Sequence, residues 1–326
     1  MAQITYHASH EQHPPSALLQ YAIAAEQAGF QAVHSSDHFH PWSERQGQSG
    51  FSFSWIAAAM QATTLPFSMV CAPGQRYHPA IVAQAVATLG EMFPGRYSVE
   101  LGSGEALNEC ITGEIWPHKE ERNARLLECA QLIRQLLKGE MVTYDGLVRI
   151  KEAKLYTLPA ITPPLMVAAL SEKTAAWAGA WADGLITVDA GKDQLNKIVD
   201  AFRNNGGAGK PVYLQMAFSY AKTEKEALDA AYDQWRTNFF APEVLNDLSR
   251  PTQFDSIADY LKPEDVAEKM LITASNERCI SEIQRYVDLG FERIILHNVH
   301  RDQELFIQEF GDKVLPHIRS TQNERS

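Results

Sequence analysis

The chain has 326 residues, 45% of them apolar, which is enough to bury the core of one large α/β domain. Its 29 Lys and Arg residues against 40 Asp and Glu give a formal net charge of -11. This balance excludes a general electrostatic footprint for nucleic acid or an anionic membrane, and favours a small-molecule partner. No apolar run approaches the ~20 residues that a membrane span needs. We therefore expect a single domain over residues 1–326.

Short β-rich runs alternate with amphipathic helical stretches along the whole chain. A strand followed by a helix is the rhythm of parallel βαβ units, and eight such pairs predict a (β/α)8 TIM barrel. The predicted strands cover 4–9, 30–37, 67–73, 96–104, 164–170, 184–190, 212–221 and 293–299, and the predicted helices cover 15–29, 54–64, 79–92, 119–139, 172–182, 192–205, 224–235 and 302–314.

Two longer stretches interrupt this rhythm, and we interpret both as insertions in the barrel. Residues 141–164, after the fourth strand, contain the hairpin-like run VTYDGLVRI. Residues 238–262, after the seventh strand, have mixed character.

The spacing of the cysteines and the pattern of the N-terminal residues indicate the cellular compartment. Cys71, Cys110, Cys129 and Cys279 are scattered without a CxxC pair, and MAQITYHASHEQ lacks the charged-then-apolar order of a secretory signal. We expect a reduced, cytoplasmic setting.

Polar loops follow most of the predicted strands, and in a TIM barrel these loops gather around one cavity at the carboxyl ends of the strands. The densest is SSDHFHPW after the second strand. Its His38 and His40 could ligate a metal, but no histidine lies between His118 and His297 to complete such a site, so we predict none. The pair could also be ordinary loop residues. A third reading is proton transfer, with His38 facing Glu105 from the loop after the fourth strand.

Several long, colinear blocks resemble one known family. SDHFHPW, FSFSWIAA, RYHPAIVAQAVATLGEMFPGR, GSGEALNE and AGAWADGLIT are similar to the glucose-6-phosphate dehydrogenase branch of the luciferase-like flavin oxidoreductases, which uses the deazaflavin coenzyme F420. The resemblance runs from Ile4 to Arg319. It implies a TIM barrel, commonly a homodimer, that binds a flavin-type ring at the carboxyl ends of the strands.

Position by position, the resemblance implies roles for residues on this rim. His38 and Glu105 match the family's acid and base, and Trp42 matches its ring-side tryptophan. The Met69–Val70 bond matches a cis peptide that supports the ring. The cofactor contacts implied are Asp37, Met69, Val70, Ala72, Ser103, Gly104 and Asn108.

The sequence departs from the family pattern at two places. Leu170 and Ser171 replace a glycine pair that opens the helix after strand five, although the amides of Leu170, Ser171 and Glu172 could still hold a phosphate. Lys192 and Thr187 are the implied substrate contacts, but Asn246 and Met270 stand where a lysine and an arginine are usual. One lysine would grip a phosphate dianion poorly, so glucose 6-phosphate is not favoured as substrate.

The sequence therefore predicts an oxidoreductase that moves a hydride between a small alcohol or carbonyl compound and F420 or FMN. Two alternatives stay open. An FMN-dependent monooxygenase would activate oxygen with reduced flavin, and a non-catalytic barrel would only bind flavin.

Overall fold

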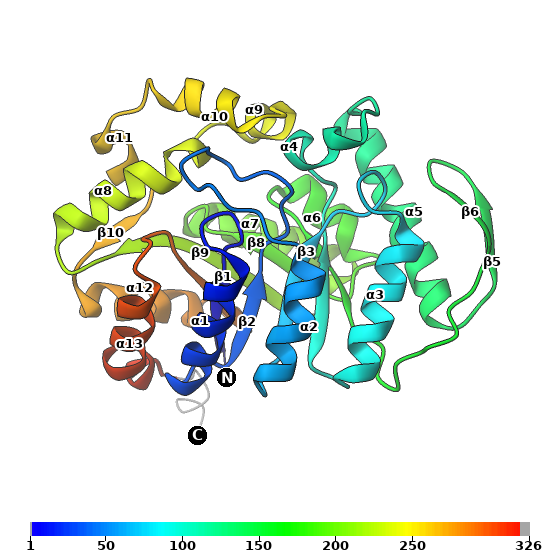
Figure 1. Cartoon of the computed structure of the whole chain (residues 1–326), viewed down its shortest axis with the longest axis horizontal. Helices are drawn as coiled ribbons and strands as arrows, with labels where there is room; N and C mark the ends of the chain where they lie inside the picture. The colour runs from blue at the N-terminus through cyan, green and yellow to red at the C-terminus, as the bar shows by residue number, and fades with distance from the viewer. Residues whose placement is uncertain (1, 320–326) are drawn as a thin grey trace.

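The computed structural model describes residues 2–319 and confirms the (β/α)8 barrel (Figure 1). Eight parallel strands form the ring in chain order, and the ring closes because β8 pairs with β9 and β11 pairs with β1. These strands are β1 (Gln3–Ala8), β2 (Ala32–Ser35), β3 (Phe67–Cys71), β4 (Tyr97–Leu101), β7 (Leu165–Ala168), β8 (Leu185–Val188), β9 (Val212–Tyr220) and β11 (Arg293–Asn298).

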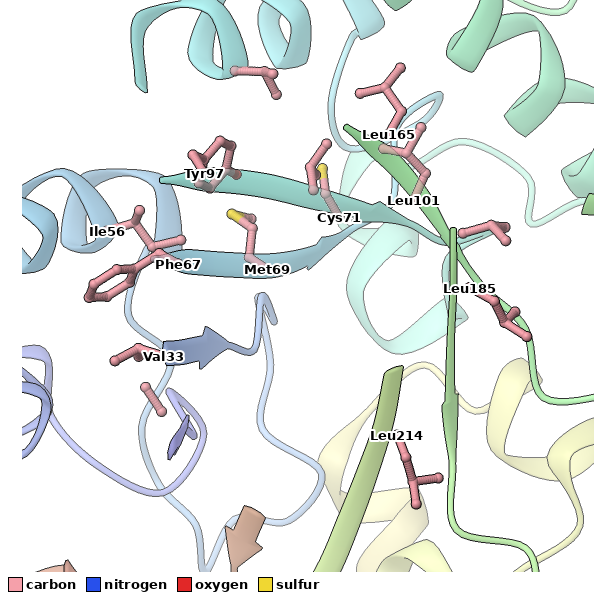
Figure 2. Packing of buried hydrophobic residues seen from close by; sticks show 14 of the residues in the cluster. Val33, Ile56, Phe67, Met69, Cys71, Tyr97, Leu101, Leu165, Leu185 and Leu214 are labelled. Carbon is pink, nitrogen blue, oxygen red and sulfur yellow. The ribbon is translucent and has the colours of Figure 1, made fainter. Parts of the chain in front are cut away.

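Helices surround the ring and bury its outer face. Phe67, Met69 and Cys71 of β3 belong to the hydrophobic layer under the helices (Figure 2). Successive side chains of a strand point to opposite faces, so Ser68 faces the barrel interior, where its hydroxyl accepts from Arg293. The surrounding helices are α1 (Pro15–Gln27), α2 (Ser52–Ala62), α3 (Pro79–Met92), α5 (Lys119–Leu137), α6 (Glu172–Gly179), α7 (Lys192–Phe202), α8 (Glu224–Trp235), α12 (Asn276–Asp288) and α13 (Gln303–Lys313).

Both predicted insertions are present. The first holds the antiparallel hairpin of β5 (Val142–Asp145) and β6 (Arg149–Ala153), which lies at the edge of the molecule beside α5 (Figure 1). The second, predicted over 238–262, holds α9 (Pro242–Asp247) and α10 (Pro251–Ala258), and it extends beyond its predicted end through α11 (Pro263–Ala267) across one end of the barrel. Each of these three helices starts with a proline in its first turn, where the missing N–H costs no hydrogen bond.

Two elements were not predicted. The first is the three-residue strand β10 (Leu271–Thr273), which pairs with the carboxyl-terminal end of β9. The second is helix α12, which precedes β11 in the chain. The strand is too short to show alternation, and α12 carries mostly polar residues around a narrow apolar stripe of Cys279, Ile283 and Val287.

The predicted cis peptide between Met69 and Val70 was wrong, since no cis peptide occurs in residues 2–319. The physical reason is the regularity of β3. Met69, Val70 and Cys71 pair in register with three successive residues of β4, and an unbroken ladder keeps the backbone extended and trans.

None of the helices in residues 2–319 has both the length and the apolar character needed to cross a bilayer.

Candidate functional site

His38 lies at the carboxyl-end rim, in the loop after β2, and an asparagine fixes its ring. Asn108 belongs to the short helix α4 (Ala106–Glu109), and its Oδ1 accepts a hydrogen bond from the Phe39 backbone N–H at 2.9 Å. The Asn108 Nδ2 group therefore faces His38 Nδ1, 3.1 Å away. The His40 carbonyl oxygen lies 3.3 Å from the same Nδ1, so a neutral ring with its proton on Nδ1 would donate to this carbonyl and leave Nε2 free to accept a proton.

The Nε2 atom of His38 faces two carboxylates. It lies 3.6 Å from Glu11 Oε1 and 3.9 Å from Glu105 Oε2. The predicted convergence of His38 and Glu105 on one rim is therefore observed. The His40 ring turns elsewhere, with its Nδ1 2.8 Å from the Leu107 carbonyl, while the His40 backbone N–H donates to Asn108 Oδ1 at 3.4 Å.

Glu11 was missed by the sequence reasoning. It lies in the loop after β1, is buried, and accepts hydrogen bonds from Ser9 and Ser36, both at 2.8 Å. Burial raises the pKa of this carboxyl, but His38 and the hydrogen bonds to it outweigh burial and leave its pKa below the usual value. The available signal was the motif HASHEQH directly after the first strand, which places a carboxylate on the same rim.

The pKa of the second carboxylate, Glu105, is shifted in the opposite direction to that of Glu11. Its pKa is raised, first by burial and further by Glu11, against the lowering effects of His38, Lys119 and Arg122. Its side chain remains 31% exposed, so it is reachable from the rim. One imidazole thus faces a carboxylate that stays ionised and another that binds a proton more readily, and this division is typical of acid–base sites.

Trp42 forms a wall of the site. Its ring lies 5.0 Å from the His38 ring at 51°, and Phe254 of α10 packs edge-on against its other side at 5.3 Å. Further contacts tie the same loop to α10, because Ser43 Oγ and Arg45 both bond Asp255. The second insertion therefore holds Trp42 in place.

Asp37 is buried and its carboxylate is occupied. Arg76 donates to Oδ2 at 2.9 Å and Tyr77 donates to Oδ1 at 3.0 Å. Burial raises the pKa of Asp37 despite the nearby guanidinium. Arg76 also lies 3.5 Å from Glu109, so this network anchors the loops after β2, β3 and β4. A role of Asp37 in holding this scaffold is thus visible in its contacts.

The loop after β4 is shaped for close approach. Gly104 has a φ of 79°, and a Cβ there would lie 2.9 Å from Glu109 Cγ and 3.4 Å from Ala72 Cβ. Gly102 leaves open the space beside Val70 and Ala168, which a Cβ would meet at 3.8 and 4.0 Å. At Gly104 the neighbouring side chains fill the place of a Cβ, whereas at Gly102 the missing side chain leaves the backbone of this strand end uncovered.

Two predicted residues point away from the rim. The Met69 side chain is fully buried in the layer between barrel and helices, close to Tyr97 (Figure 2), so it does not reach the rim. Thr187 is buried and pairs in register with Leu214, which belongs to the same outer layer. Its hydroxyl faces the helices rather than the barrel opening.

The start of α6 lies near the start of α5. Ser171 caps α6, accepting from the Thr174 N–H at 3.3 Å, and Leu170 is 54% exposed. Lys173 Nζ lies 4.0 Å from Glu120, which brings the two helix starts together. The amides at this end suit an anion, although the exposed Glu172 opposes one.

Lys192 is the first residue of α7 and is exposed. No hydrogen bond or ion pair links it to another side chain anywhere in residues 2–319. Asn246 lies in α9, and Met270 packs on a small apolar cluster with Ala231 and Val266. Of these three positions only Lys192 carries a positive charge, so together they offer a sugar phosphate a single ammonium group.

Comparison with known proteins places the chain in a class. The family model of the luciferase-like monooxygenases matches residues 1–293, so the chain belongs to that family. Among its relatives, a protein from Intrasporangium calvum named F420-dependent glucose-6-phosphate dehydrogenase is 37% identical, covering 98% of this chain and 99% of that protein. The resemblance expected from the sequence is confirmed.

Solved structures give the same class. An F420-dependent secondary alcohol dehydrogenase, in complex with an F420–acetone adduct, has a TM-score of 0.89 at 32% identity and covers 98% of this chain and 99% of its own. The coenzyme F420-dependent tetrahydromethanopterin reductase from Methanopyrus kandleri has a TM-score of 0.78 at 19% identity, with 98% and 99% covered. The latter likeness concerns the fold alone.

Proposed function

We propose that the chain is an oxidoreductase that moves a hydride between a small alcohol, or the corresponding carbonyl compound, and a flavin-type cofactor. F420 is the leading cofactor and FMN is the alternative. One observation carries the proposal: His38 Nε2 stands between Glu11 and Glu105 on the rim of a barrel whose full-length relatives are F420-dependent dehydrogenases. Mere binding of flavin would require no such arrangement.

The cofactor would supply the hydride acceptor or donor. His38 would exchange the proton of the substrate oxygen at Nε2, and the ionised Glu11 would stabilise the imidazolium formed when that proton is taken up. Glu105 would deliver the proton that accompanies hydride uptake, since its raised pKa favours the protonated form. Trp42 would exclude water beside the reacting groups.

The residues present fit the cofactor at both of its ends. The open space at Gly102 and the turn at Gly104 would admit the ring, next to Val70, Ala72, Ser103 and Asn108. The phosphate would dock on the amides at the start of α6, around Leu170, Ser171 and Glu172, where the positive end of the helix dipole favours an anion.

An uncharged alcohol or ketone suits the site better than a sugar phosphate. Lys192 is exposed and is the one cation among the implied substrate contacts, and Met270 is packed on apolar neighbours. The solved relative with the F420–acetone adduct supports a small secondary alcohol.

The test begins with fluorescence titration of purified protein with F420 and, separately, with FMN. Turnover is then measured with isopropanol and with glucose 6-phosphate, and oxygen uptake is followed with reduced FMN. We expect F420 binding and isopropanol oxidation. Oxygen uptake with FMN would instead identify a monooxygenase, and binding without turnover in either assay would leave only a flavin-binding barrel. The function fails if neither cofactor binds.

We also infer a cytoplasmic homodimer. The four cysteines are unpaired, and three of them are buried, which suits a reducing compartment. The family resemblance favours the dimer, and light scattering of the purified protein tests it.

A further inference from the structure

Lys119 opens α5 and reaches the loop that carries Glu105. Its Nζ donates to Ser103 Oγ at 2.7 Å. Ser103 and Glu105 flank Gly104, whose left-handed backbone turns the loop. Because Ser103 is tied to α5 and the turn at Gly104 packs on Glu109, the backbone before Glu105 is held from two sides.

The charged groups around Glu105 come from three parts of the fold. His38 is 3.9 Å away after β2, and Glu11 approaches from the loop after β1. Lys119 and Arg122 approach from the first turn of α5. Three positive or protonatable groups therefore oppose one carboxylate.

The two cations of α5 are not equivalent. Arg122 stacks on Trp116, with the guanidinium carbon 4.4 Å from the ring centre, and Asp247 lies near it. Lys119 contacts the Glu105 loop directly and is half-buried, so solvent screens its charge less than that of a surface lysine. Burial is also the main cause of its own lowered pKa, followed by Arg122.

We propose that Lys119 is a positioning residue of the reaction: it fixes the loop that carries Glu105 and favours the ionised form of that carboxylate. The inference rests on the proposed function, in which Glu105 exchanges a proton. Burial and Glu11 raise the pKa of Glu105, and the Lys119 ammonium lowers it. Removing the ammonium should therefore make Glu105 release its proton at higher pH. The direction is the same whether Glu105 serves as acid or as base.

The first measurement needs no cofactor. The protein is labelled with 13C at the glutamate carboxyl groups and titrated by NMR, and the Glu105 signal is identified by its absence in Glu105→Gln. We expect the Glu105 titration to move to higher pH in Lys119→Met and to stay near wild type in Lys119→Arg. Lys173→Met removes a neighbouring but exposed lysine and serves as the control.

The second measurement follows turnover against pH. In Lys119→Met the limb of the kcat/KM profile that belongs to Glu105 should move upward, with the F420 dissociation constant changed less than threefold. An unmoved Glu105 titration in Lys119→Met, or an equal movement in Lys173→Met, would overturn the inference. Absence of F420 and FMN binding in wild type would instead refute the proposed function, while the NMR result would still report on Lys119.

Discussion

Glu11 and Glu105 share one histidine but differ in solvation, and that difference sets their roles. Hydroxyls of Ser9 and Ser36 bind the first carboxylate, whereas no hydroxyl in residues 2–319 binds the second. An ionised Glu11, 3.6 Å from His38 Nε2, places a negative charge beside the imidazole.

Glu11→Gln keeps the shape of the site and removes this charge. We expect kcat to fall by roughly 10–100-fold, an order-of-magnitude expectation, because the imidazolium loses its counter-charge. Cofactor affinity, measured by fluorescence titration, should be nearly unchanged. Glu44→Gln, on an exposed side chain of the next loop, is the control. A Glu11→Gln enzyme as fast as wild type would remove Glu11 from the mechanism.

His38→Ala tests the central group. We expect turnover to fall by about 10²–10⁴-fold with cofactor affinity spared, because proton transfer is lost while the ring and phosphate contacts remain. His317→Ala, on an exposed histidine far along the chain, should leave the rate unchanged. Equal rates for wild type and His38→Ala would contradict the proposed chemistry.

Glu100 is a buried carboxylate that the mechanism does not use. It faces the barrel interior, 3.7 Å from His34 Nε2, and burial raises its pKa to about 7. Its folded pKa lies above the unfolded value of 4.5, so stability is lost as pH rises from 4.5 towards 7 and stays lost above that.

Glu100→Gln should therefore stabilise the fold at pH 8, by up to about 3 kcal/mol, and change little at pH 5. Urea unfolding at the two pH values decides this, with the exposed Glu91→Gln as control. Equal destabilisation at both values would show that the His34 contact outweighs burial.

At the scale of elements, α10 determines where Trp42 lies. Phe254 is fully buried against the tryptophan, and Asp255 binds Ser43 of the same loop. An insertion far along the chain therefore sets one wall of the site.

Phe254→Ala should cost about 3–5 kcal/mol of stability, since the cavity beside Trp42 cannot fully close. Phe254→Leu retains most of the volume and should fold normally but raise the KM for the alcohol. Thermal unfolding and steady-state kinetics provide the measurements. Phe51→Ala, on a half-exposed ring, should change neither. If Phe254→Leu matched wild type in every parameter, the supporting role of α10 would be excluded.

The strands could be predicted because the alternation of apolar runs and polar loops is visible in the local sequence. The direction of a side chain at a strand end is not visible there, because it depends on the register of the sheet. The eight barrel strands follow apolar runs closed by polar loops, so β1 to β4 were located from residues such as Ile4, Val33 and Val99. Thr187 and Met69 sit in those same runs, but one step of register decides whether a side chain faces the barrel opening or the helices. Glu11 escaped notice because its significance depends on His38, 27 residues away, and only the closed ring brings the two together.

At the scale of the whole molecule, several histidines are buried and held neutral. Burial lowers the pKa of His10 and of His13 to about 4 and of His297 to about 3, and that of His7 and His34 well below 6.5. In the unfolded chain each would bind a proton near pH 6.5, while the folded chain would not.

Stability should therefore be present above pH 6.5 and be lost as pH falls through 6 towards 4, because the unfolded state binds more protons there. Chemical denaturation at a series of pH values measures the slope. His10→Asn removes one titrating group and should flatten the slope by about one proton. A stability curve that is flat from pH 7 to pH 5 would contradict this account.

The second insertion leaves the barrel at the end of α8 and returns through β10, and both ends meet in a small apolar cluster of their own. Trp235, Met270 and Ile272 pack there around Ala231, Val266 and Val299, apart from the main hydrophobic core. A substitution inside this cluster should therefore loosen the second insertion, and with it the support of Trp42, while the packing of the eight-stranded ring is kept.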